Sequence, residues 1–277
     1  MSVADPAAPA LRILILVSGL LARFAPKSRS IAKPSTGERL VYAVGDVHGR
    51  LDLLDPLIRR IADDVLQLRP SERPMLVFVG DYVDRGLESK GVIDRLIGLR
   101  AEAAFEVRTL KGNHEEAMIN FLSDAGAGAE WVEYGGGQTL VSYGVNPPKQ
   151  RDNAAEWERA REEFGQRMPP SHLAFLSGLE LIMVVGDYAF VHAGLRPGLS
   201  IQDQDEHDLM WIRDVFLNER RPFEKVVVHG HTPEEAPFVG ERRIGIDTGA
   251  YATGVLTAVR LMGEERTILQ VKASQIG

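Results

Sequence analysis

Residues 40–49 read Leu-Val-Tyr-Ala-Val-Gly-Asp-Val-His-Gly, an apolar run that ends directly in a polar turn. The same design recurs where the apolar run Met75–Val79 leads into Gly80-Asp81-Tyr82-Val83-Asp84-Arg85-Gly86. Short apolar runs of this kind indicate buried β-strands. Each stretch therefore predicts a strand that carries acidic and other polar side chains at its carboxyl end.

Three more polar motifs follow apolar runs further along the chain. Val107–Leu110 precedes Gly112-Asn113-His114-Glu115, and later runs precede His192 and His229-Gly230-His231. Apolar residues at helical spacing, as between Leu54 and Val65, separate the first runs. This alternation predicts an α/β fold, and the closely spaced strand candidates of the second half predict that part of it is antiparallel. Because ligands bind at the carboxyl ends of strands in open α/β sheets, the five motifs can meet at one edge.

The chain divides into a predicted N-terminal tail, residues 1–38, and one domain, residues 39–277. The tail contains the apolar run Ile13–Leu21, which is too short to span a bilayer and lacks the basic flank of a secretory signal. We expect a poorly ordered tail and no stable membrane span, with weak interfacial anchoring as the alternative. Within the domain, residues 123–180 break the strand–helix rhythm and predict a helical insertion that covers one end of the sheet.

The composition favours a site built from oxygen and nitrogen ligands. The chain has 277 residues, no cysteine, and 39 acidic against 32 basic residues, which gives a net charge of −7. Without cysteine there is no disulfide, no thiolate metal site and no cysteine nucleophile, which fits a cytoplasmic location. An acidic chain also disfavours nucleic acid as a partner.

Six polar side chains predict a site for two divalent cations. Asp46 and His48, two residues apart in a turn, can reach one cation. The two oxygens of Asp81 can bridge cations about 3.5–4 Å apart, and the amide oxygen of Asn113 is acceptable to a hard cation. The predicted ligands are Asp46, His48, Asp81, Asn113, His192 and His231. Mn²⁺ is the expected metal for this oxygen and nitrogen set, with Fe, Zn and Mg as alternatives.

The order of these motifs resembles the calcineurin-like metallophosphoesterases, and within them the bacterial type of the phosphoprotein phosphatase (Ser/Thr) branch. The resemblance runs from about Leu40 to Leu261. It implies a four-layer α/β fold, a mixed β-sandwich flanked by helices, in which the segment 123–180 lies near the active site. By position it implies that Asp46 and His48 hold metal 1, that Asp81 bridges, and that Asn113, His192 and His231 hold metal 2.

The resemblance also implies how a phosphate ester is hydrolysed. Two cations lower the pKa of a bridging water, so that hydroxide is present near neutral pH and attacks phosphorus. Arg85 is expected to neutralise the non-bridging phosphoryl oxygens. His114 is expected to protonate the departing oxygen, and Asp84 to keep His114 oriented and protonated.

Two further residues are expected to contact the substrate. His229 precedes His231 by two residues, so on an extended strand both would face the same side; a supporting position behind the ligands is the alternative. Arg213 lies in Trp211-Ile212-Arg213-Asp214, which resembles a substrate-side segment of the family, although an ion pair with Asp214 would also explain it.

The substrate that this interpretation favours is phosphoserine or phosphothreonine in a phosphorylated protein or peptide. The nearest alternative is a symmetrical bis(5'-nucleosyl)-tetraphosphatase, a diadenosine tetraphosphate hydrolase, whose second motif lacks the pair that is intact here as Asp84 and Arg85. A phosphoesterase of broad specificity stays open. A phosphoprotein-binding scaffold without turnover is disfavoured because every expected ligand is present. The sequence carries no indication of oligomeric state.

Overall fold

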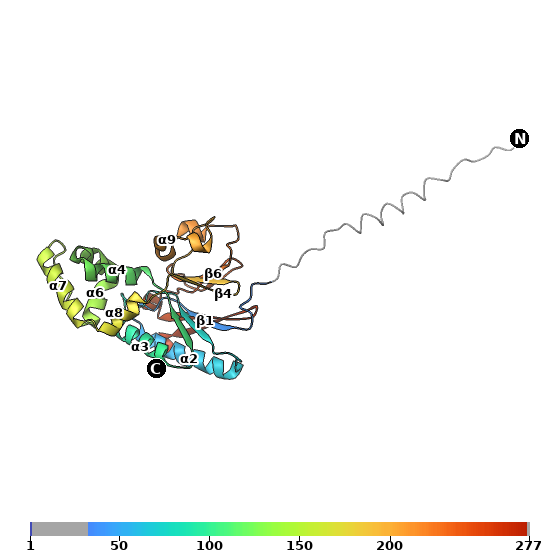
Figure 1. Ribbon diagram of the computed structural model, residues 1–277, viewed down its shortest axis with the longest axis horizontal. Helices are drawn as coiled ribbons and strands as arrows, with labels where there is room; N and C mark the ends of the chain where they lie inside the picture. The colour runs from blue at the N-terminus through green and yellow to red at the C-terminus, as the bar shows by residue number, and fades with distance from the viewer. Residues whose placement is uncertain (2–32, 276–277) are drawn as a thin grey trace. The chain divides into compact units, whose positions relative to one another are not determined.

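The computed structural model describes residue 1 and residues 33–275, and from Pro34 onward the chain forms one compact unit (Figure 1). Most of the predicted tail, residues 1–38, lies outside the described residues, together with the apolar run that was considered as a membrane anchor. Within the described part of the chain, no helix combines the length and the apolar character needed to cross a membrane.

The residues just before the first strand are tied to the body of the domain. The Thr36 amide donates to the Gly263 carbonyl at 3.1 Å, and the Gly263 amide donates to the Thr36 hydroxyl at 3.1 Å. The Ser35 amide donates to the Asp187 carboxylate. The domain boundary at residue 38 stays a prediction.

Five strands form the first sheet, in the order β10-β9-β1-β2-β3. They are β1 (Leu40–Val44), β2 (Met75–Phe78), β3 (Glu106–Thr109), β9 (Val255–Met262) and β10 (Glu265–Lys272). The β1, β2 and β3 strands pair in parallel, whereas β9 is antiparallel to both β1 and β10. Because these three strands are parallel, the carboxyl ends of β1, β2 and β3 lie at the same end of the sheet.

The second sheet also has five strands, in the order β4-β5-β6-β8-β7. They are β4 (Ile182–Val185), β5 (Tyr188–Val191), β6 (Val226–His229), β7 (Phe238–Val239) and β8 (Arg243–Gly245). Its centre, β5-β6-β8, is parallel, and its outer pairs are antiparallel. The sequence did not indicate β7, which has only two residues, both exposed.

Strand alternation explains how the two sheets pack. In β1, Tyr42 and Val44 belong to the cluster shared with the helices, whereas Val41 and Ala43 belong to the cluster between the sheets. The second sheet contributes side chains such as Phe190 to the same inter-sheet cluster. Both faces of β1 are thus buried, which explains its unbroken apolar sequence.

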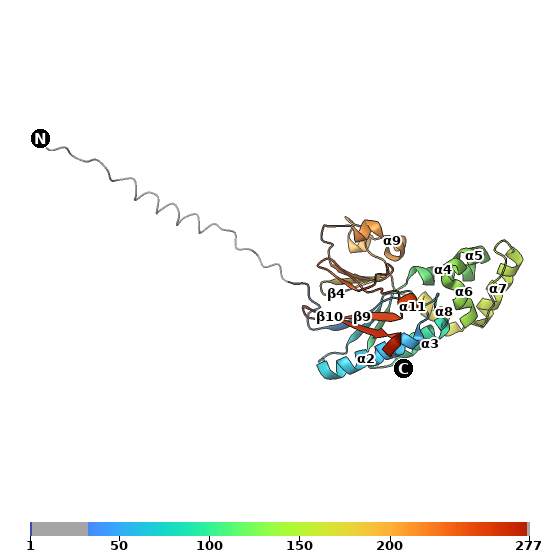
Figure 2. The same ribbon diagram turned by 180° about the vertical axis from the view of Figure 1, so that it is seen from behind.

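Helices cover the outer face of each sheet (Figures 1 and 2). Helices α2 (Leu51–Leu68) and α3 (Ser89–Ala101) pack on the first sheet, and α9 (Glu206–Trp211) and α10 (Asp214–Leu217) pack on the second. The result is a layered α/β arrangement of two mixed sheets flanked by helices, which confirms the predicted four-layer fold class.

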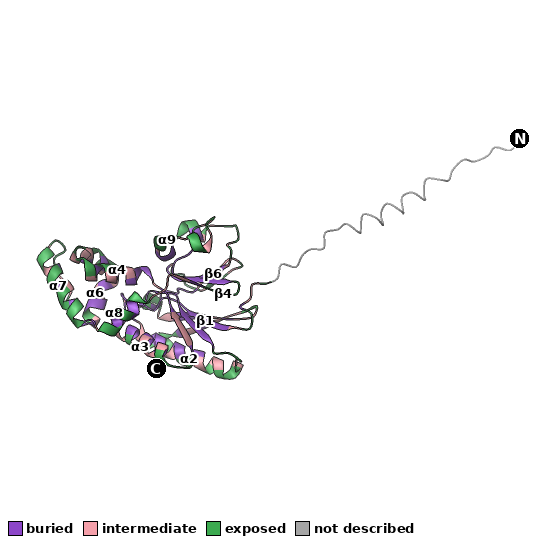
Figure 3. Cartoon of the chain, viewed as in Figure 1, coloured by how far each residue is buried: buried purple, intermediate pink, exposed green. Residues whose placement is uncertain are grey.

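A group of helices lies at one end of the layered body (Figure 1). It comprises α4 (Asn113–Ser123), η1 (Ala125–Ala127), α5 (Gly128–Trp131), a kinked π-helical segment η2 (Val132–Gly136), α6 (Gly137–Ser142), α7 (Ala154–Arg167) and α8 (Pro170–Ser177). Phe121, Trp131 and Phe164 form its aromatic core, with ring centroids 5.1–6.1 Å apart. Figure 3 shows that the buried residues of these helices line their inner sides.

Three short helical segments complete the described chain. They are η3 (Ile201–Asp203), α11 (Ala250–Thr253) and η4 (Ala273–Gln275). Helix α11 follows the loop after β8 and lies near the turn between β1 and α2, because the Ala250 carbonyl accepts a hydrogen bond from Arg50 at 2.7 Å.

Candidate active site

The five polar motifs meet in one buried cluster, as the strand ends predicted. Asp46 follows β1, Asp81 follows β2, Asn113 begins α4 after β3, and His192 and His231 follow β5 and β6. Each of these side chains is buried. The first sheet thus contributes carboxylates, an amide and the imidazole of His48, and the second sheet contributes two further imidazoles.

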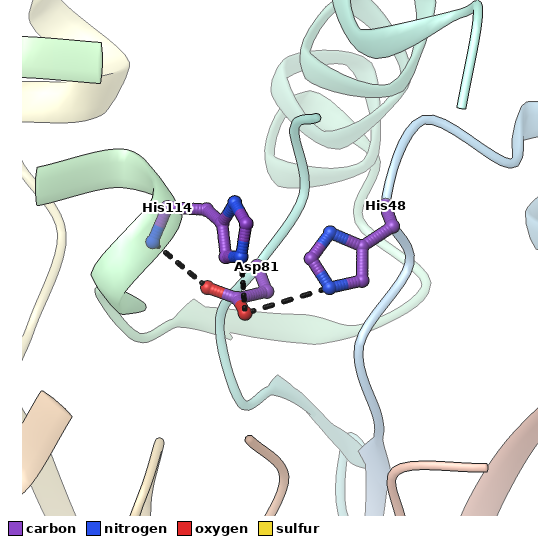
Figure 4. A group of neighbouring side chains, drawn as sticks. All are labelled: His48, Asp81 and His114. Atoms are coloured by element: carbon purple, nitrogen blue, oxygen red, sulfur yellow. Dashed lines mark hydrogen bonds and ion pairs between the residues drawn. The ribbon is translucent and has the colours of Figure 1, made fainter. Parts of the chain in front are cut away.

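The Asp81 carboxylate lies at the centre of this cluster. Its Oδ2 is 3.6 Å from His48 Nε2 and 3.9 Å from His114 Nε2, and its Oδ1 is 3.4 Å from His192 Nε2. Figure 4 shows His48, from the loop after β1, and His114, from the first turn of α4, directed at the carboxylate. A carboxylate with both oxygens faced by nitrogen atoms suits a bridge between two cations.

A second convergence is centred on Asn113. Its Oδ1 lies 2.9 Å from His192 Nε2 and 2.9 Å from His231 Nδ1. The His231 amide donates to Asp46 Oδ2 at 3.0 Å, which joins the Asp46 loop to the second sheet. The structure therefore brings together all six predicted ligands.

Several of these side chains sit on a backbone that non-glycine residues seldom adopt. Positive φ angles occur at His48 (46°), Asp81 (53°) and His231 (63°). Such conformations are unfavourable for residues with a Cβ atom and are retained mainly at functional sites. Close approach also requires glycine, since a Cβ on Gly230 would lie 1.9 Å from Asp46 Oδ1 and one on Gly112 2.1 Å from Asp81 Oδ1.

Main-chain contacts orient two of the imidazoles. His48 Nδ1 lies 2.8 Å from the Val83 carbonyl, and His192 Nδ1 lies 2.9 Å from the Val79 carbonyl. Each Nδ1 therefore carries the proton, and each Nε2 turns its lone pair toward Asp81. A hydrogen bond from the second ring nitrogen is the usual support of a metal-binding histidine.

Electrostatics separate the imidazoles into two kinds. Burial lowers the pKa of His48 to about 3 and that of His231 to about 2, and it lowers the pKa of His192. Burial acts on His114 in the same direction, but the carboxylates of Asp81 and Asp84 outweigh it and raise its pKa. His48, His192 and His231 are thus suited to bind cations, and His114 is suited to carry a proton.

The carboxylates show that the site is fitted for positive charge. Burial, followed by repulsion from Asp247 and Asp81, raises the pKa of Asp46 well above its usual range. Burial also raises the pKa of Asp247 to about 6. Three buried carboxylates that repel one another are costly unless cations or protons offset their charge.

The donor set fits two divalent cations. Among the described residues, two groups of side chains place their ligand atoms within 4.8 Å of one another, namely His48, Asp81 and His114, and Asp81, His192 and His231. Two buried atoms of this cluster, Asp46 Oδ1 and His231 Nε2, have no hydrogen-bond partner in the described part of the chain. Hard oxygen and imidazole donors converge on one shared carboxylate, as a binuclear centre requires.

The predicted catalytic residues lie beside this cluster. His114 Nδ1 is 2.6 Å from Asp84 Oδ2, and Arg85 Nη2 is 3.3 Å from His114 Nε2. The Arg85 guanidinium also faces the Tyr251 ring, 4.3 Å from its centroid. The roles of His114, Asp84 and Arg85 stay predictions, but their mutual placement agrees with them.

The two predicted substrate contacts differ in their placement. Arg213 is exposed, and its charge contributes to the lowered pKa values of His192 and His231, so it lies near the cluster. His229 instead contacts the guanidinium of Arg243 at 3.2 Å. The expectation that His229 and His231 face the same side is wrong, because β6 ends at His229 and His231 has a positive φ.

Sequence analysis missed the parts played by Glu115 and Asp247. The buried Glu115 carboxylate accepts main-chain hydrogen bonds from Asp81, Tyr82, Val83 and Gly112, at 2.7–3.3 Å. It therefore fastens the loop after β2 to the loop after β3. Glu115 is the last residue of the Gly112–Glu115 motif, and this position was the only sequence signal for its role. The contact between Asp247 and Asp46 depends on how the two sheets pack, so the sequence carried no signal for it.

Comparison with known proteins agrees with this geometry. Residues 40–258 match the calcineurin-like phosphoesterase family. The asymmetrical bis(5'-nucleosyl)-tetraphosphatase PrpE of Geobacillus thermodenitrificans is 30% identical over 253 residues, covering 83% of this chain and 93% of that protein. Shewanella-like protein phosphatase 2 of Arabidopsis thaliana is 30% identical over 188 residues, covering 57% of this chain and 46% of that protein.

Similarity to solved structures supports the fold. The crystal structure of a putative diadenosine tetraphosphatase superposes with a TM-score of 0.58 and 19% identity, covering 87% of this chain and all of that one. The family match covers β1 to β8, in both sheets, as well as the loops that carry the buried cluster. It follows that this chain belongs to the calcineurin-like phosphoesterases and is a metal-dependent phosphoesterase.

Proposed function

We propose that this chain hydrolyses a phosphoanhydride bond of a dinucleoside polyphosphate, with diadenosine tetraphosphate as the model substrate, and cleaves it asymmetrically. The observation that carries this proposal is the extent of the match. The tetraphosphatase relative aligns over 83% of this chain, whereas the protein phosphatase relative aligns over 57%. This proposal reverses the preference drawn from the motifs alone, which favoured a phosphorylated protein over a dinucleoside tetraphosphate as substrate.

The chain's own residues supply binding, orientation and a proton. When bound, two divalent cations, for which we propose Mn²⁺, would polarise phosphoryl oxygens and lower the pKa of the attacking water. We assign them to the six residues gathered around Asp81 and Asn113. Arg85 lies beside this cluster, with its planar guanidinium against His114 and the Tyr251 ring, where it is placed to bind phosphoryl oxygens in a bidentate manner.

Water forms the new bond to phosphorus, and the bridging oxygen leaves with the other product. Attack on the α-phosphorus yields AMP and ATP. His114, held by Asp84 at 2.6 Å, is placed to give its Nε2 proton to the departing oxygen. Tyr251, which is partly exposed beside Arg85, offers an aromatic surface close to the phosphate site.

A second candidate, a serine/threonine protein phosphatase acting on a phosphorylated protein or peptide, is favoured by the His114–Asp84 pair. A serine alkoxide is a much poorer leaving group than a nucleotide phosphate, so it gains more from a positioned proton donor. The short contact between His114 and the fully buried Asp84 carboxylate would keep such a proton donor protonated and in place.

Side-by-side turnover tests the choice. Manganese-loaded protein is given diadenosine tetraphosphate and a phosphoserine peptide, and the nucleotide products are separated. We expect a higher kcat/KM for the dinucleotide, with AMP and ATP in equal amounts. Preference for the peptide by tenfold or more would establish the protein phosphatase instead, and ADP as the sole product would establish symmetrical cleavage.

A further inference from the structure

The Asp84 carboxylate is fully buried and is oriented by three side-chain donors. Its Oδ2 lies 2.6 Å from His114 Nδ1 and accepts a hydrogen bond of 2.9 Å from Trp131 Nε1. Its Oδ1 accepts a hydrogen bond of 2.6 Å from the Thr139 hydroxyl. Two of the three donors therefore come from the helical segment Gly128–Ser142, which comprises α5, η2 and α6.

A buried carboxylate depends strongly on its donors, because an unpaired charge away from water is very unfavourable. The donors therefore decide which way the Asp84 oxygens point. With Oδ1 held by Thr139 and one lone pair of Oδ2 held by Trp131, a further acceptor site of Oδ2 faces His114. The direction of the His114 imidazole is thus set from the helical segment.

The same segment holds the backbone of Asp84 and Arg85, the two residues that form the catalytic turn. Asp84 and Arg85 have consecutive positive φ angles of 72° and 67°, which non-glycine residues adopt only under constraint. The Asp84 amide donates to the hydroxyls of Thr139 at 2.9 Å and Ser89 at 3.0 Å, and the Arg85 amide donates to the Gly135 carbonyl at 3.1 Å. These bonds stabilise a turn that would otherwise relax.

Gly135 makes this contact possible. Its φ of 108° lies outside the range of other residues, and a Cβ there would be 2.7 Å from both the amide nitrogen and Cγ of Arg85. The kink of η2 therefore brings its backbone directly against the Arg85 backbone.

Aromatic packing aims the Trp131 indole. The ring packs against both Phe121 and Phe164, with centroids 5.1 and 5.8 Å away, and is almost completely buried. Phe164 belongs to α7, so the packing of α7 against Trp131 helps to set the direction in which the indole N–H donates to Asp84.

We propose that the segment Gly128–Ser142 positions the catalytic turn, with Trp131 and Thr139 as positioning residues for the Asp84–His114 pair and Gly135 as the anchor of Arg85. The inference rests on the proposed role of His114 as proton donor and does not depend on which phosphate compound is the substrate.

The test uses single-group changes in the full-length, manganese-loaded protein. W131F removes the indole N–H and keeps an aromatic ring, T139V removes the hydroxyl at equal size, and T139S restores it. W157F is the matched control, because Trp157 lies in the same helical group and donates to the Arg151 carbonyl at 3.0 Å. Metal content and thermal unfolding are measured for each variant.

The first readout is dependence on the leaving group. W131F and T139V should lose roughly tenfold to a hundredfold in kcat on an alkyl phosphate, as expected for a misplaced catalytic group. Their loss on p-nitrophenyl phosphate, whose leaving group barely needs a proton, should be much smaller. T139S should recover most of the loss, and W131F should cause no further loss in an H114N background.

The second readout does not require turnover. A short hydrogen bond between His114 and Asp84 should give a downfield imidazole proton resonance, assigned by its disappearance in H114N. This resonance should move in W131F and T139V but not in W157F or T139S. An unmoved resonance with losses equal to those of W157F would overturn the proposal. Equal losses of H114N on both leaving groups would instead refute the acid role of His114, while the resonance still tests positioning.

Discussion

His192 Nε2 lies 3.4 Å from Asp81 Oδ1, although Asp81 follows a strand of the first sheet and His192 follows a strand of the second. The metal-binding cluster therefore exists only where the two sheets are packed together. The inter-sheet core, with side chains such as Val77 and Phe190, fixes this distance. Cation binding and packing of the two sheets should consequently be coupled.

The first prediction concerns Asp81. D81N keeps the shape of the side chain but removes the negative charge that both cations would share. We expect turnover to fall below detection and metal content, measured by elemental analysis of purified protein, to drop from two ions toward one or none. Wild-type turnover with two bound ions would refute the bridging assignment.

The second prediction separates His114 from the ligands. H114N should retain its metal content, because an acid that carries a proton does not bind a cation. Turnover should fall by roughly 10²–10⁴-fold if His114 is a general acid. A variant that loses one ion would show instead that the group formed by His48, Asp81 and His114 holds a metal.

The motifs predicted which residues gather, and the structure explains why some details escaped them. Strand ends place Asp46, Asp81 and Asn113 at one edge by topology alone, so local sequence was sufficient. Ser89 is the first residue of α3, and its hydroxyl accepts a hydrogen bond from the Asp84 amide. This hydrogen bond depends on the conformation of the turn at Asp84 and Arg85, and local sequence propensity does not encode that conformation.

Contacts between distant segments were the least predictable. Trp131 and Thr139 lie in the segment 123–180, for which the sequence predicted only a helical insertion. Their hydrogen bonds to Asp84 depend on the docking of the helical group against the β2 loop. Asp247 likewise reaches Asp46 only because β8 lies in the second sheet beside β6.

The third prediction concerns stability without metal. In the fold, the pKa of Asp247 is about 6, above its ordinary value of 3.8. Between these values the Asp247 carboxyl holds more protons in the folded state than in the unfolded chain, so its contribution to stability falls as pH rises through this window and then levels off. The lowered pKa values of His48, His192 and His231 act in the opposite direction, so this contribution is measured as the difference between the wild type and D247N. The loss should be on the order of 3 kcal/mol at most.

Urea unfolding at pH 4.5, 6 and 7.5, with a chelator or with Mn²⁺, measures this effect. Mn²⁺ should remove most of the decline because the cations take the place of the protons. D247N should stabilise the chelated protein at pH 7.5. A D247N variant whose stability relative to the chelated wild type does not rise across the window would contradict the account.

The fourth prediction concerns Glu115, whose carboxylate accepts four main-chain hydrogen bonds. E115Q turns one acceptor into an N–H donor that faces other donors. We expect the free energy of unfolding to fall by about 2–4 kcal/mol and metal affinity by roughly 10–100-fold. E116Q, the same change one residue later, is the control, since the Glu116 carboxylate accepts one side-chain hydrogen bond in the described chain, from the Trp211 indole. Equal effects of both changes would show that charge loss, rather than loop fastening, matters.

The most direct measurement of the central claim is anomalous X-ray diffraction from crystals grown with Mn²⁺. The account predicts two anomalous peaks about 3.5–4 Å apart, with Asp81 in contact with both, Asp46 and His48 at one, and Asn113, His192 and His231 at the other. His114 should bind neither peak and should remain bonded to Asp84. A single peak, or a peak coordinated by His114, would contradict the two-metal assignment.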